Sequence, residues 1–311
     1  MKKILITGCF GFIGKTLTDE FKKNGYDVYG IGHSNVISPQ QKSFIQKEIS
    51  FSNLDESLSL MDTPPDVIYH LAGGSSVSIA ENNPLENYQK TVNSSNTLFE
   101  WVRLNSPKSR IIVASSAAIY GANHCNKLSE MTPTQPFSVY GHHKKIVEQL
   151  SNIYIEKYSL DIINARIFSV YGNGLKKQFL WDFCSKLKAA SHDDSINVFG
   201  TGNEVRDWIH ISDLVNALKK ISEINTVPSV INIGTGKGTT IKQMIEYICN
   251  SWFGENKLKI QFNGNVREGD PFSLISDATI KNTFVGSHKI NLQDGVNEYV
   301  NWYKAHSNEE N

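Results

Sequence analysis

Short runs of apolar residues alternate with longer amphipathic stretches through the first half of the chain. The short runs are rich in Ile and Val and are bounded by Gly, Asn, Asp or Pro, as strands buried on both faces are. This alternation predicts βαβ units that build a parallel sheet. The predicted strands span residues 3–7, 27–31, 44–49, 66–71, 110–114 and 161–168, and the predicted crossover helices span residues 12–24, 85–105 and 139–158.

The pattern becomes less regular after Tyr171. A glycine-containing loop, a helix near residues 179–190 and several short strands follow, and helices and strands no longer alternate cleanly. We therefore predict an α/β protein with a first domain over residues 1–170 and a smaller mixed α/β lobe over residues 171–311. Some segments of the second part are expected to cross back to the first.

Composition narrows the class of protein. The chain has 311 residues, of which 40% are hydrophobic and 20% charged, as in ordinary globular proteins. Lys plus Arg and Asp plus Glu both number 31, so no bulk positive charge attracts nucleic acid or an anionic membrane. No apolar run approaches the length of a membrane span. The four cysteines form no CxxC pair, which favours a reducing compartment. We expect a cytoplasmic protein without a metal site and with neither nucleic acid nor membrane as partner.

A glycine-rich turn joins the first predicted strand to the first predicted helix, with the sequence TGCFGFIG over residues 7–14. The first glycine permits a tight turn, the second lets the backbone approach a pyrophosphate, and the third lets helix and strand pack closely. Free N–H groups at the helix N-terminus favour an anion there. The turn predicts a Rossmann-like doubly wound sheet that binds a dinucleotide, with contacts from Gly8, Gly11, Phe12, Ile13 and Gly14.

The end of the second predicted strand bears on which dinucleotide binds. An Asp or Glu at this place bonds to the ribose 2′-hydroxyl of NAD, but here the chain reads GIGHSN over residues 30–35. His33 and Ser34 could donate to a 2′-phosphate, so NADP(H) is preferred, and NAD stays possible because the usual Arg is also missing. Glu48 and Ile49, at the end of the third predicted strand, are expected to meet the adenine.

Tyr140 and Lys144 are four residues apart at the start of a predicted helix and therefore share one face. An ammonium and an oxidised nicotinamide both favour a phenolate, so they are expected to lower the pKa of Tyr140 from its ordinary value near ~10. Tyr140 could then exchange a proton with a sugar hydroxyl while a hydride moves. Ser116, at the end of the fifth predicted strand, would hold the same oxygen, and Lys144 would also bind the nicotinamide ribose.

Together these motifs resemble the extended short-chain dehydrogenases/reductases, in the branch of nucleotide-sugar epimerases, dehydratases and reductases. The resemblance covers nearly the whole chain and includes HLA at 70–72, RIFSVYG at 166–172, RDWIH at 206–210, NIGTG at 232–236 and REGD at 267–270. In relatives, the arginines that match Arg206 and Arg267 bind the nucleotide diphosphate, for which a guanidinium is suited. The resemblance implies further cofactor contacts from Leu71, Ala72, Gly73, Ser115, Tyr140, Lys144 and Phe168, and substrate contacts from Ser116, Ser169, Phe179, Arg206, Arg267 and Asp270.

Departures from the family pattern bear on the reaction. Sugar 4,6-dehydratases carry an Asp-Glu pair where this chain has Ala117 and Ala118, and methyl groups do no acid–base work. Dehydration is therefore not expected. Bifunctional epimerase-reductases of GDP-fucose synthesis carry a Cys at the place of Ala118. Inversion of the sugar ring by the route of those enzymes is therefore also disfavoured. Thr91 and Ser169 replace two Asn residues that are common in the family.

Two reactions fit the same residues. The favoured prediction is a reductase that uses NADPH on the 4-keto group of a nucleotide-linked 6-deoxy sugar, with a proton from Tyr140. The alternative is a 4-epimerase that keeps NAD bound. A non-catalytic dinucleotide-binding protein and a steroid or flavonoid reductase are less favoured. By resemblance we expect a homodimer formed through the helices near residues 85–105 and 139–158. The sequence identifies neither the nucleotide base nor the sugar.

Overall fold

The computed structural model describes residues 2–32, 63–122, 124, 126–190, 195–254, 259–266 and 270–307. Its centre is a sheet of six described strands in the order β2-β1-β3-β4-β5-β9, and all neighbours in it are parallel. The strands are β1 Lys3–Thr7, β2 Asp27–Ile31, β3 Val67–His70, β4 Arg110–Ser116, β5 Asp161–Ile167 and β9 Val230–Ile233. The prediction of a parallel α/β sheet is therefore confirmed. The predicted strand over residues 44–49 lies outside the described residues.

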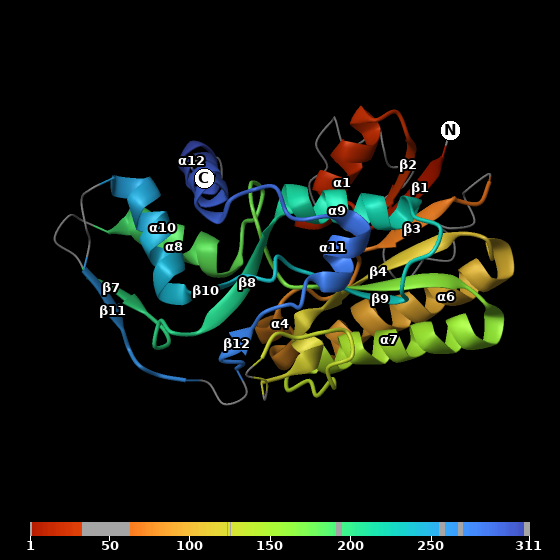
Figure 1. The fold of residues 1–311 in the computed structure, drawn as a ribbon, viewed down its shortest axis with the longest axis horizontal. Helices are drawn as coiled ribbons and strands as arrows, with labels where there is room; N and C mark the ends of the chain where they lie inside the picture. Colours follow the sequence, from red (N-terminus) through yellow and green to blue (C-terminus); the bar gives the residue numbers. More distant parts are fainter. Residues whose placement is uncertain are drawn as a thin grey trace.

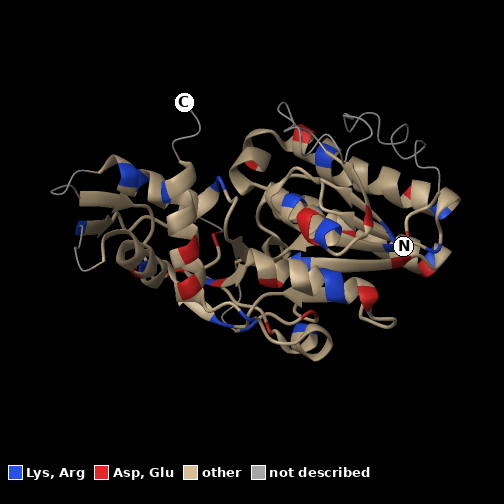
Figure 2. Cartoon of the chain, turned by 90° about the horizontal axis from the view of Figure 1, so that it is seen from above, with Lys and Arg blue, Asp and Glu red and all other residues tan. Residues whose placement is uncertain are grey.

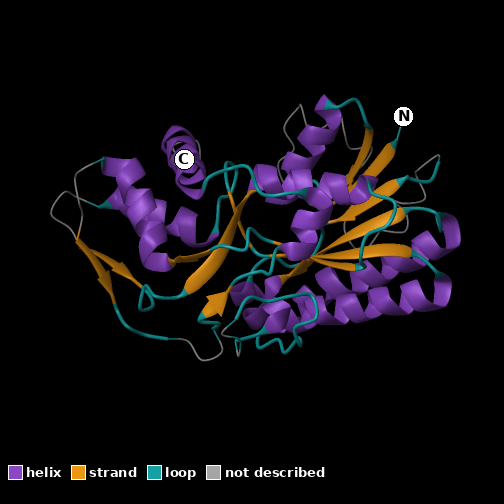
Figure 3. Cartoon of the chain, in the orientation of Figure 1, coloured by secondary structure: helices purple, strands orange, loops and turns teal. Residues whose placement is uncertain are grey.

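Helices cover both faces of this sheet (Figures 1 and 3). Successive strand residues face opposite sides, so Ile4 and Ile6 join one hydrophobic core and Leu5 joins the other. The first core lies beneath α1 (Phe12–Lys23), α9 (Ile211–Glu223) and α11 (Thr279–Val285), and the second beneath α6 (Ser94–Asn105) and α7 (Val139–Tyr158). The strands β1, β3, β4, β5 and β9 are thus mostly buried, which explains their apolar sequences, whereas β2 at the edge of the described sheet is largely half-buried.

The helix predicted over residues 85–105 is divided into three pieces. It consists of α5 (Pro84–Tyr88), a π-helical turn η2 (Gln89–Asn93) and α6. A short helix α4 (Val77–Asn82) precedes it. Within the π turn, the Thr91 hydroxyl accepts a hydrogen bond from the N–H of Gly74 at 2.9 Å. The interruption therefore lies against the loop that follows β3, and π turns are frequent near functional sites.

The second lobe lies beside the first and has its own core (Figure 1). Its strands form the order β10-β8-β12, with β6 on β8, and a separate pair of β7 and β11. The remaining elements are η3 Ala117–Tyr120, β6 Ser169–Tyr171, α8 Gln178–Ala189, β7 Ser195–Val198, β8 Val205–His210, β10 Gly238–Thr240, α10 Ile241–Phe253, β11 Lys259–Phe262, β12 Ser273–Leu274 and α12 Leu292–His306. The elements α9, β9 and α11 pack with the first sheet although they follow residue 170 in sequence, so the chain crosses between the two lobes. A domain boundary near residue 170 therefore stays a proposal.

Charged residues of both signs are interspersed along the ribbon (Figure 2). Across the described ranges, no helix is long and apolar enough to cross a membrane. The same ranges contain no group of three or more His, Cys, Asp or Glu residues that could hold a metal ion.

Arg110, at the start of β4, ties the sheet to the end of α9. Its Nε donates to Asp161 Oδ2 at 2.7 Å, and its terminal nitrogens donate to the carbonyls of Ile221 at 3.2 Å and Asn225 at 3.0 Å. Replacing Arg110 with Ala should lower the free energy of unfolding by about 2 kcal/mol, because charged hydrogen bonds to unpaired helix carbonyls are lost. Urea unfolding followed by circular dichroism measures this change.

The matched control is Arg103→Ala, which removes a surface ion pair with Glu100 on α6. Exposed pairs of this kind contribute little, so the urea midpoint should stay nearly unchanged. Equal effects of the two substitutions would contradict the role given to Arg110.

Candidate active site

The glycine turn lies between β1 and α1 at the edge where the carboxyl ends of the parallel strands meet. Gly8 has φ +74°, and a Cβ there would lie 2.9 Å from the backbone nitrogen of Ala72. A Cβ on Gly14 would overlap the carbonyl oxygen of Gly8. Gly11 begins α1 without a side-chain cap, and the first turn of the helix carries no acidic residue. The turn therefore offers free N–H groups in a space without side chains, which fits a pyrophosphate.

The end of β3 forms the wall beside this turn. His70 is fully buried between the hydroxyls of Thr7 (2.8 Å to Nδ1) and Ser95 (2.9 Å to Nε2). Burial, and then the charge of Lys144, lower the pKa of His70 to about 3, so the ring is neutral. The Thr7 hydroxyl also accepts from the N–H of Ala72 at 3.3 Å. This network fixes the backbone of Leu71, Ala72 and Gly73, the predicted cofactor contacts that follow β3.

The structure brings Ser116, Tyr140 and Lys144 together. Ser116 ends β4, and Tyr140 and Lys144 lie in the first two turns of α7, which begins at Ser138 as a side-chain cap. The Ser116 side chain lies near the Tyr140 hydroxyl and favours its ionised form. Lys144 Nζ donates to the carbonyl of Ala114 at 2.7 Å and lies 5.9 Å from the centre of the Tyr140 ring. Two segments about 25 residues apart in sequence therefore form one polar cluster.

The protonation of this cluster differs from the prediction in one respect. Burial raises the pKa of Tyr140, and the nearby Ser116 side chain opposes this only in part. Burial lowers the pKa of Lys144 to about 8, against the opposing charge of Glu148. The protein alone thus keeps Tyr140 neutral, because the Lys144 ammonium bonds to a carbonyl rather than to the phenol. A lowered Tyr140 pKa would require the positive charge of an oxidised nicotinamide nearby.

Two predicted cofactor residues have their side chains turned elsewhere. The Ser115 hydroxyl donates to Glu148 Oε1 at 2.5 Å and is buried, so only the Ser115 backbone is left for a cofactor. The reason is the alternation of β4, which points Ser115 and Ser116 to opposite sides. The Phe168 side chain is buried with Ala117 and Tyr120 in a small apolar cluster.

A cavity of about 240 Å³ opens on the second lobe. It brings together three predicted substrate residues, Ser169, Phe179 and Arg206. Arg206 donates to the carbonyl of Val205 at 2.9 Å, and burial lowers the pKa of its guanidinium, against the charges of Asp270 and Glu204. A half-buried guanidinium beside an apolar cavity suits a ligand that combines an anionic group with an apolar surface.

Sequence reasoning missed five residues of this cavity: Leu175, Gln178, Leu180, Trp208 and Ile241. Gln178 has φ +66°, a left-handed conformation that is uncommon for a non-glycine residue. Trp208 was within a quoted motif, yet nothing in its spacing indicated that it faces a cavity. Contacts from four separate elements decide this lining, so no local pattern could have identified it.

Five predicted site residues lie outside the described residues: His33, Ser34, Glu48, Ile49 and Arg267. Asp270 is described and exposed, and its charge acts on Arg206.

Comparison with known proteins identifies the family and the fold of the chain. A sequence model of the NAD dependent epimerase/dehydratase family matches residues 4–234. A UDP-glucose 4-epimerase of Lactobacillus helveticus is 28% identical over 331 residues, covering 98% of each chain. The solved UDP-glucose 4-epimerase of Thermotoga maritima, with UDP-glucose, is 26% identical at a TM-score of 0.86 and covers 98% of this chain and 99% of that one.

A second solved structure is a UDP-glucuronic acid 4-epimerase variant from Bacillus cereus, in complex with UDP-4-deoxy-4-fluoro-glucuronic acid and NAD. It is 25% identical at a TM-score of 0.85 and covers 97% of this chain and 99% of that one. The resemblance predicted from the sequence motifs is thereby confirmed at the level of the family and of the fold.

Proposed function

Since this chain belongs to the NAD dependent epimerase/dehydratase family, we propose that it is a nucleotide-sugar 4-epimerase that keeps NAD bound. The observation that carries the proposal is the close approach of Ser116, Tyr140 and Lys144, with the Lys144 ammonium beside Gly73 in the loop that follows β3. Relatives that are 25% identical or more and named as 4-epimerases support it. The 4-keto reductase favoured from the sequence has no comparable support, so the alternative prediction replaces it.

The proposed chemistry assigns a step to each residue of the cluster. The Tyr140 oxygen takes the proton of the sugar 4-hydroxyl when the 4-keto sugar forms and returns it when the alcohol forms again. The Ser116 hydroxyl bonds to the same sugar oxygen and stabilises the charge that develops on it. The Lys144 ammonium stabilises the phenolate and binds the nicotinamide ribose. When bound, NAD supplies the chemistry of accepting a hydride from the sugar carbon and giving it back.

The cofactor prediction changes with the reaction. An epimerase regenerates its cofactor within each turnover, so a tightly held NAD suits it better than an exchangeable NADPH. The solved Bacillus cereus epimerase contains NAD, which supports the same choice. The preference for NADP(H) rested on His33 and Ser34, which are outside the described residues. We therefore propose NAD, held by the glycine turn and by the backbone of Leu71, Ala72 and Gly73.

The test has two parts. The purified protein is denatured and any released dinucleotide is identified by mass spectrometry. The native protein is then incubated with UDP-glucose, UDP-N-acetylglucosamine or UDP-glucuronic acid, and the products are followed by NMR. We expect released NAD and the 4-epimer of at least one substrate without net oxidation. Consumption of NADPH by a 4-keto sugar nucleotide, with no epimer from any substrate, would overturn the proposal in favour of a reductase.

Arg206 is proposed to bind the nucleotide diphosphate. Replacing Arg206 with Met should raise KM for the nucleotide sugar by about 10- to 100-fold, because a charge-assisted, bidentate contact is lost, with a smaller effect on kcat. Steady-state kinetics of epimerisation measures both constants. Lys186→Met, which removes an exposed charge on α8, is the control and should leave KM unchanged. An unchanged KM in the Arg206 variant would show that the diphosphate binds elsewhere.

A homodimer through α6 and α7 is part of the proposal. Leu104, Ile153 and Tyr158, on these two helices, are half or more exposed despite being large and apolar. Light scattering after gel filtration measures the assembly, and a mass of one chain would contradict it. The cytoplasmic location expected from the cysteine pattern also stays a proposal.

A further inference from the structure

Three side chains at intervals of four residues join α7 to the end of β4. Tyr140 lies near the Ser116 side chain, Lys144 donates to the carbonyl of Ala114, and Glu148 accepts from the hydroxyl of Ser115 at 2.5 Å. Because residues i, i+4 and i+8 share one helix face, one stripe of α7 meets three consecutive residues of the strand. Glu148 therefore extends the Tyr-Lys pair by one helical turn, although it contacts neither the cofactor turn nor the substrate cavity.

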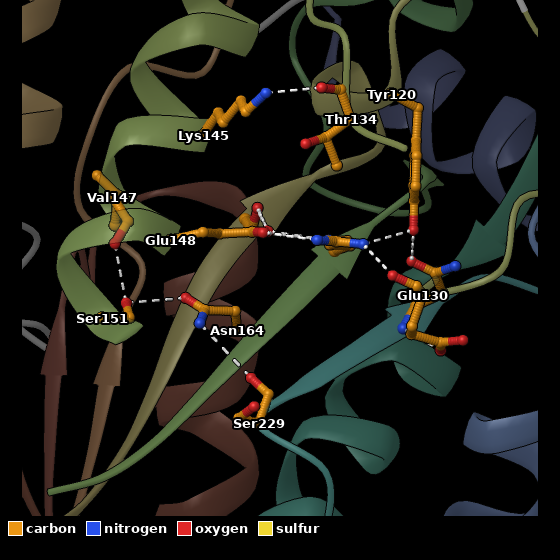
Figure 4. Close-up of polar contacts among 12 residues, drawn as sticks. Tyr120, Glu130, Thr134, Lys145, Val147, Glu148, Ser151, Asn164 and Ser229 are labelled. Atoms are coloured by element: carbon orange, nitrogen blue, oxygen red, sulfur yellow. Dashed lines mark hydrogen bonds and ion pairs between the residues drawn. The ribbon is translucent and has the colours of Figure 1, made fainter. Parts of the chain in front are cut away.

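The Glu148 carboxylate is held from a second side by Arg166 of β5 (Figure 4). Arg166 donates from Nε to Oε1 at 3.0 Å and from a terminal nitrogen to Oε2 at 2.8 Å. The side chains of Arg166 and Glu148 are only 7% and 9% exposed. A two-nitrogen contact of this kind fixes both the position and the plane of the carboxylate.

Arg166 is itself anchored on the side away from Glu148. It donates to the Tyr120 hydroxyl at 2.9 Å and to the Glu130 carbonyl at 3.0 Å, and the Tyr120 hydroxyl donates to Asn232 Oδ1 at 2.7 Å. Figure 4 shows the dashed contacts that run from Glu148 toward Tyr120 and Glu130. The carboxylate of Glu148 therefore has no freedom to rotate away from β4.

We propose that Glu148 is a positioning residue of the active site: its carboxylate fixes the end of β4 against α7 and supplies the negative charge that faces the Lys144 ammonium. The proposal rests on the roles given above to Ser116, Tyr140 and Lys144. It adds that their arrangement depends on a buried carboxylate that touches no substrate. A charge one turn from Lys144 in a buried site acts with little screening from solvent.

The charged and titratable groups around Lys144 come from three elements. His70 of β3 is neutral, since burial lowers its pKa to about 3. Tyr140 of α7 is neutral, since burial raises its pKa. Ala114 of β4 offers a carbonyl. Among the described residues, Glu148 is the charge that raises the pKa of Lys144 against burial, which lowers it to about 8. Removing the carboxylate should therefore make Lys144 lose its proton at lower pH.

The direct test is an NMR titration of Lys144 in protein with 13C-labelled lysine, with the signal assigned from Lys144→Met. In Glu148→Gln, the pKa of Lys144 should fall by at least about half a unit. Glu156→Gln, which removes an exposed carboxylate two turns further along α7, should leave the titration unchanged. Equal titrations of Lys144 in the wild type and Glu148→Gln would overturn the proposal.

A variant with an unpaired buried Arg166 is at risk of not folding, so the double variant Glu148→Gln/Arg166→Met removes both buried charges together. A fall in the Lys144 pKa is also expected in the double variant, but a smaller one, because a positive charge is removed as well. An unchanged value there would also count against the proposal. Because this readout needs no turnover, it stays informative if the epimerase assignment fails.

Two further measurements distinguish a positioning role of Glu148 from a merely structural one: the pH–rate profile of Glu148→Gln and the kcat of Ser115→Ala. In Glu148→Gln, the alkaline limb of kcat should move to lower pH with the Lys144 titration, whereas a purely structural defect lowers kcat equally at every pH. In Ser115→Ala, which keeps the carboxylate, kcat should fall about threefold or more while the titration of Lys144 does not move. An unchanged kcat in Ser115→Ala would contradict the claim that Glu148 fixes the end of β4 against α7.

Discussion

The Tyr140→Phe protein is expected to epimerise nucleotide sugars with a kcat lowered by about 10²- to 10⁴-fold. The substitution removes only the hydroxyl that lies near Ser116 and is proposed to carry the proton of the sugar 4-hydroxyl. The ring keeps its place at the start of α7, so the fold and the binding of the dinucleotide should be preserved. Conversion of the sugar nucleotide at saturating concentration, followed by NMR, measures kcat.

Tyr158→Phe is the matched control for this change. Tyr158 ends the same helix and is 50% exposed, so loss of its hydroxyl should leave kcat unchanged. The amount of dinucleotide that copurifies should be equal in the wild type and both variants. Full activity of the Tyr140→Phe protein would contradict the enzymatic assignment of this site, and it would favour a protein that binds dinucleotide without catalysis.

The Gly14→Ala protein is expected to lose its dinucleotide and part of its stability. A Cβ at this position overlaps the carbonyl oxygen of Gly8 and lies 2.9 Å from the Cα of Cys9. Since both neighbours are backbone atoms, the strain can be relieved only by moving the glycine turn or the first turn of α1. Such overpacking costs about 1–3 kcal/mol of unfolding free energy and displaces the N–H groups that are proposed to bind the pyrophosphate. Urea unfolding and mass spectrometry of released dinucleotide measure the two effects.

Asp19→Ala is the corresponding control, because it places the same methyl group on an exposed position of the same helix. Its dinucleotide content should equal that of the wild type. A Gly14→Ala protein that retains its full dinucleotide content would show that the turn after β1 does not bind the pyrophosphate.

Most of the fold could be predicted because its signals are local. A buried parallel strand is a short apolar run, and a crossover helix is an amphipathic stretch, so the alternation along residues 1–170 predicts the central sheet. The division of the helix near residue 90 could not be predicted. The π turn brings Thr91 to the N–H of Gly74, a contact with a different segment of the chain.

The same distinction holds for the active site. Tyr140 and Lys144 are neighbours through helical spacing alone, and Ser116 follows a strand whose end lies at the ligand edge of the sheet. The partner of Glu148 is a serine 33 residues earlier, and that pairing depends on how α7 crosses β4. The preference for NADP(H) has no support from the solved Bacillus cereus relative, which contains NAD. It rested on the absence of one carboxylate after β2, which is a weak sign when no other residue supports it.

The sequence by itself determined the class of fold, and it predicted the glycine turn and the cluster of Ser116, Tyr140 and Lys144, because periodicity, glycine spacing and helical intervals act over a few residues. Only the tertiary structure decided which side chains line the cavity beside Arg206, which hydroxyl of the Ser115-Ser116 pair faces the site, and which carboxylate faces Lys144. These features depend on contacts between segments that are far apart in the chain. Their geometry is set by the packing of whole elements rather than by any local pattern.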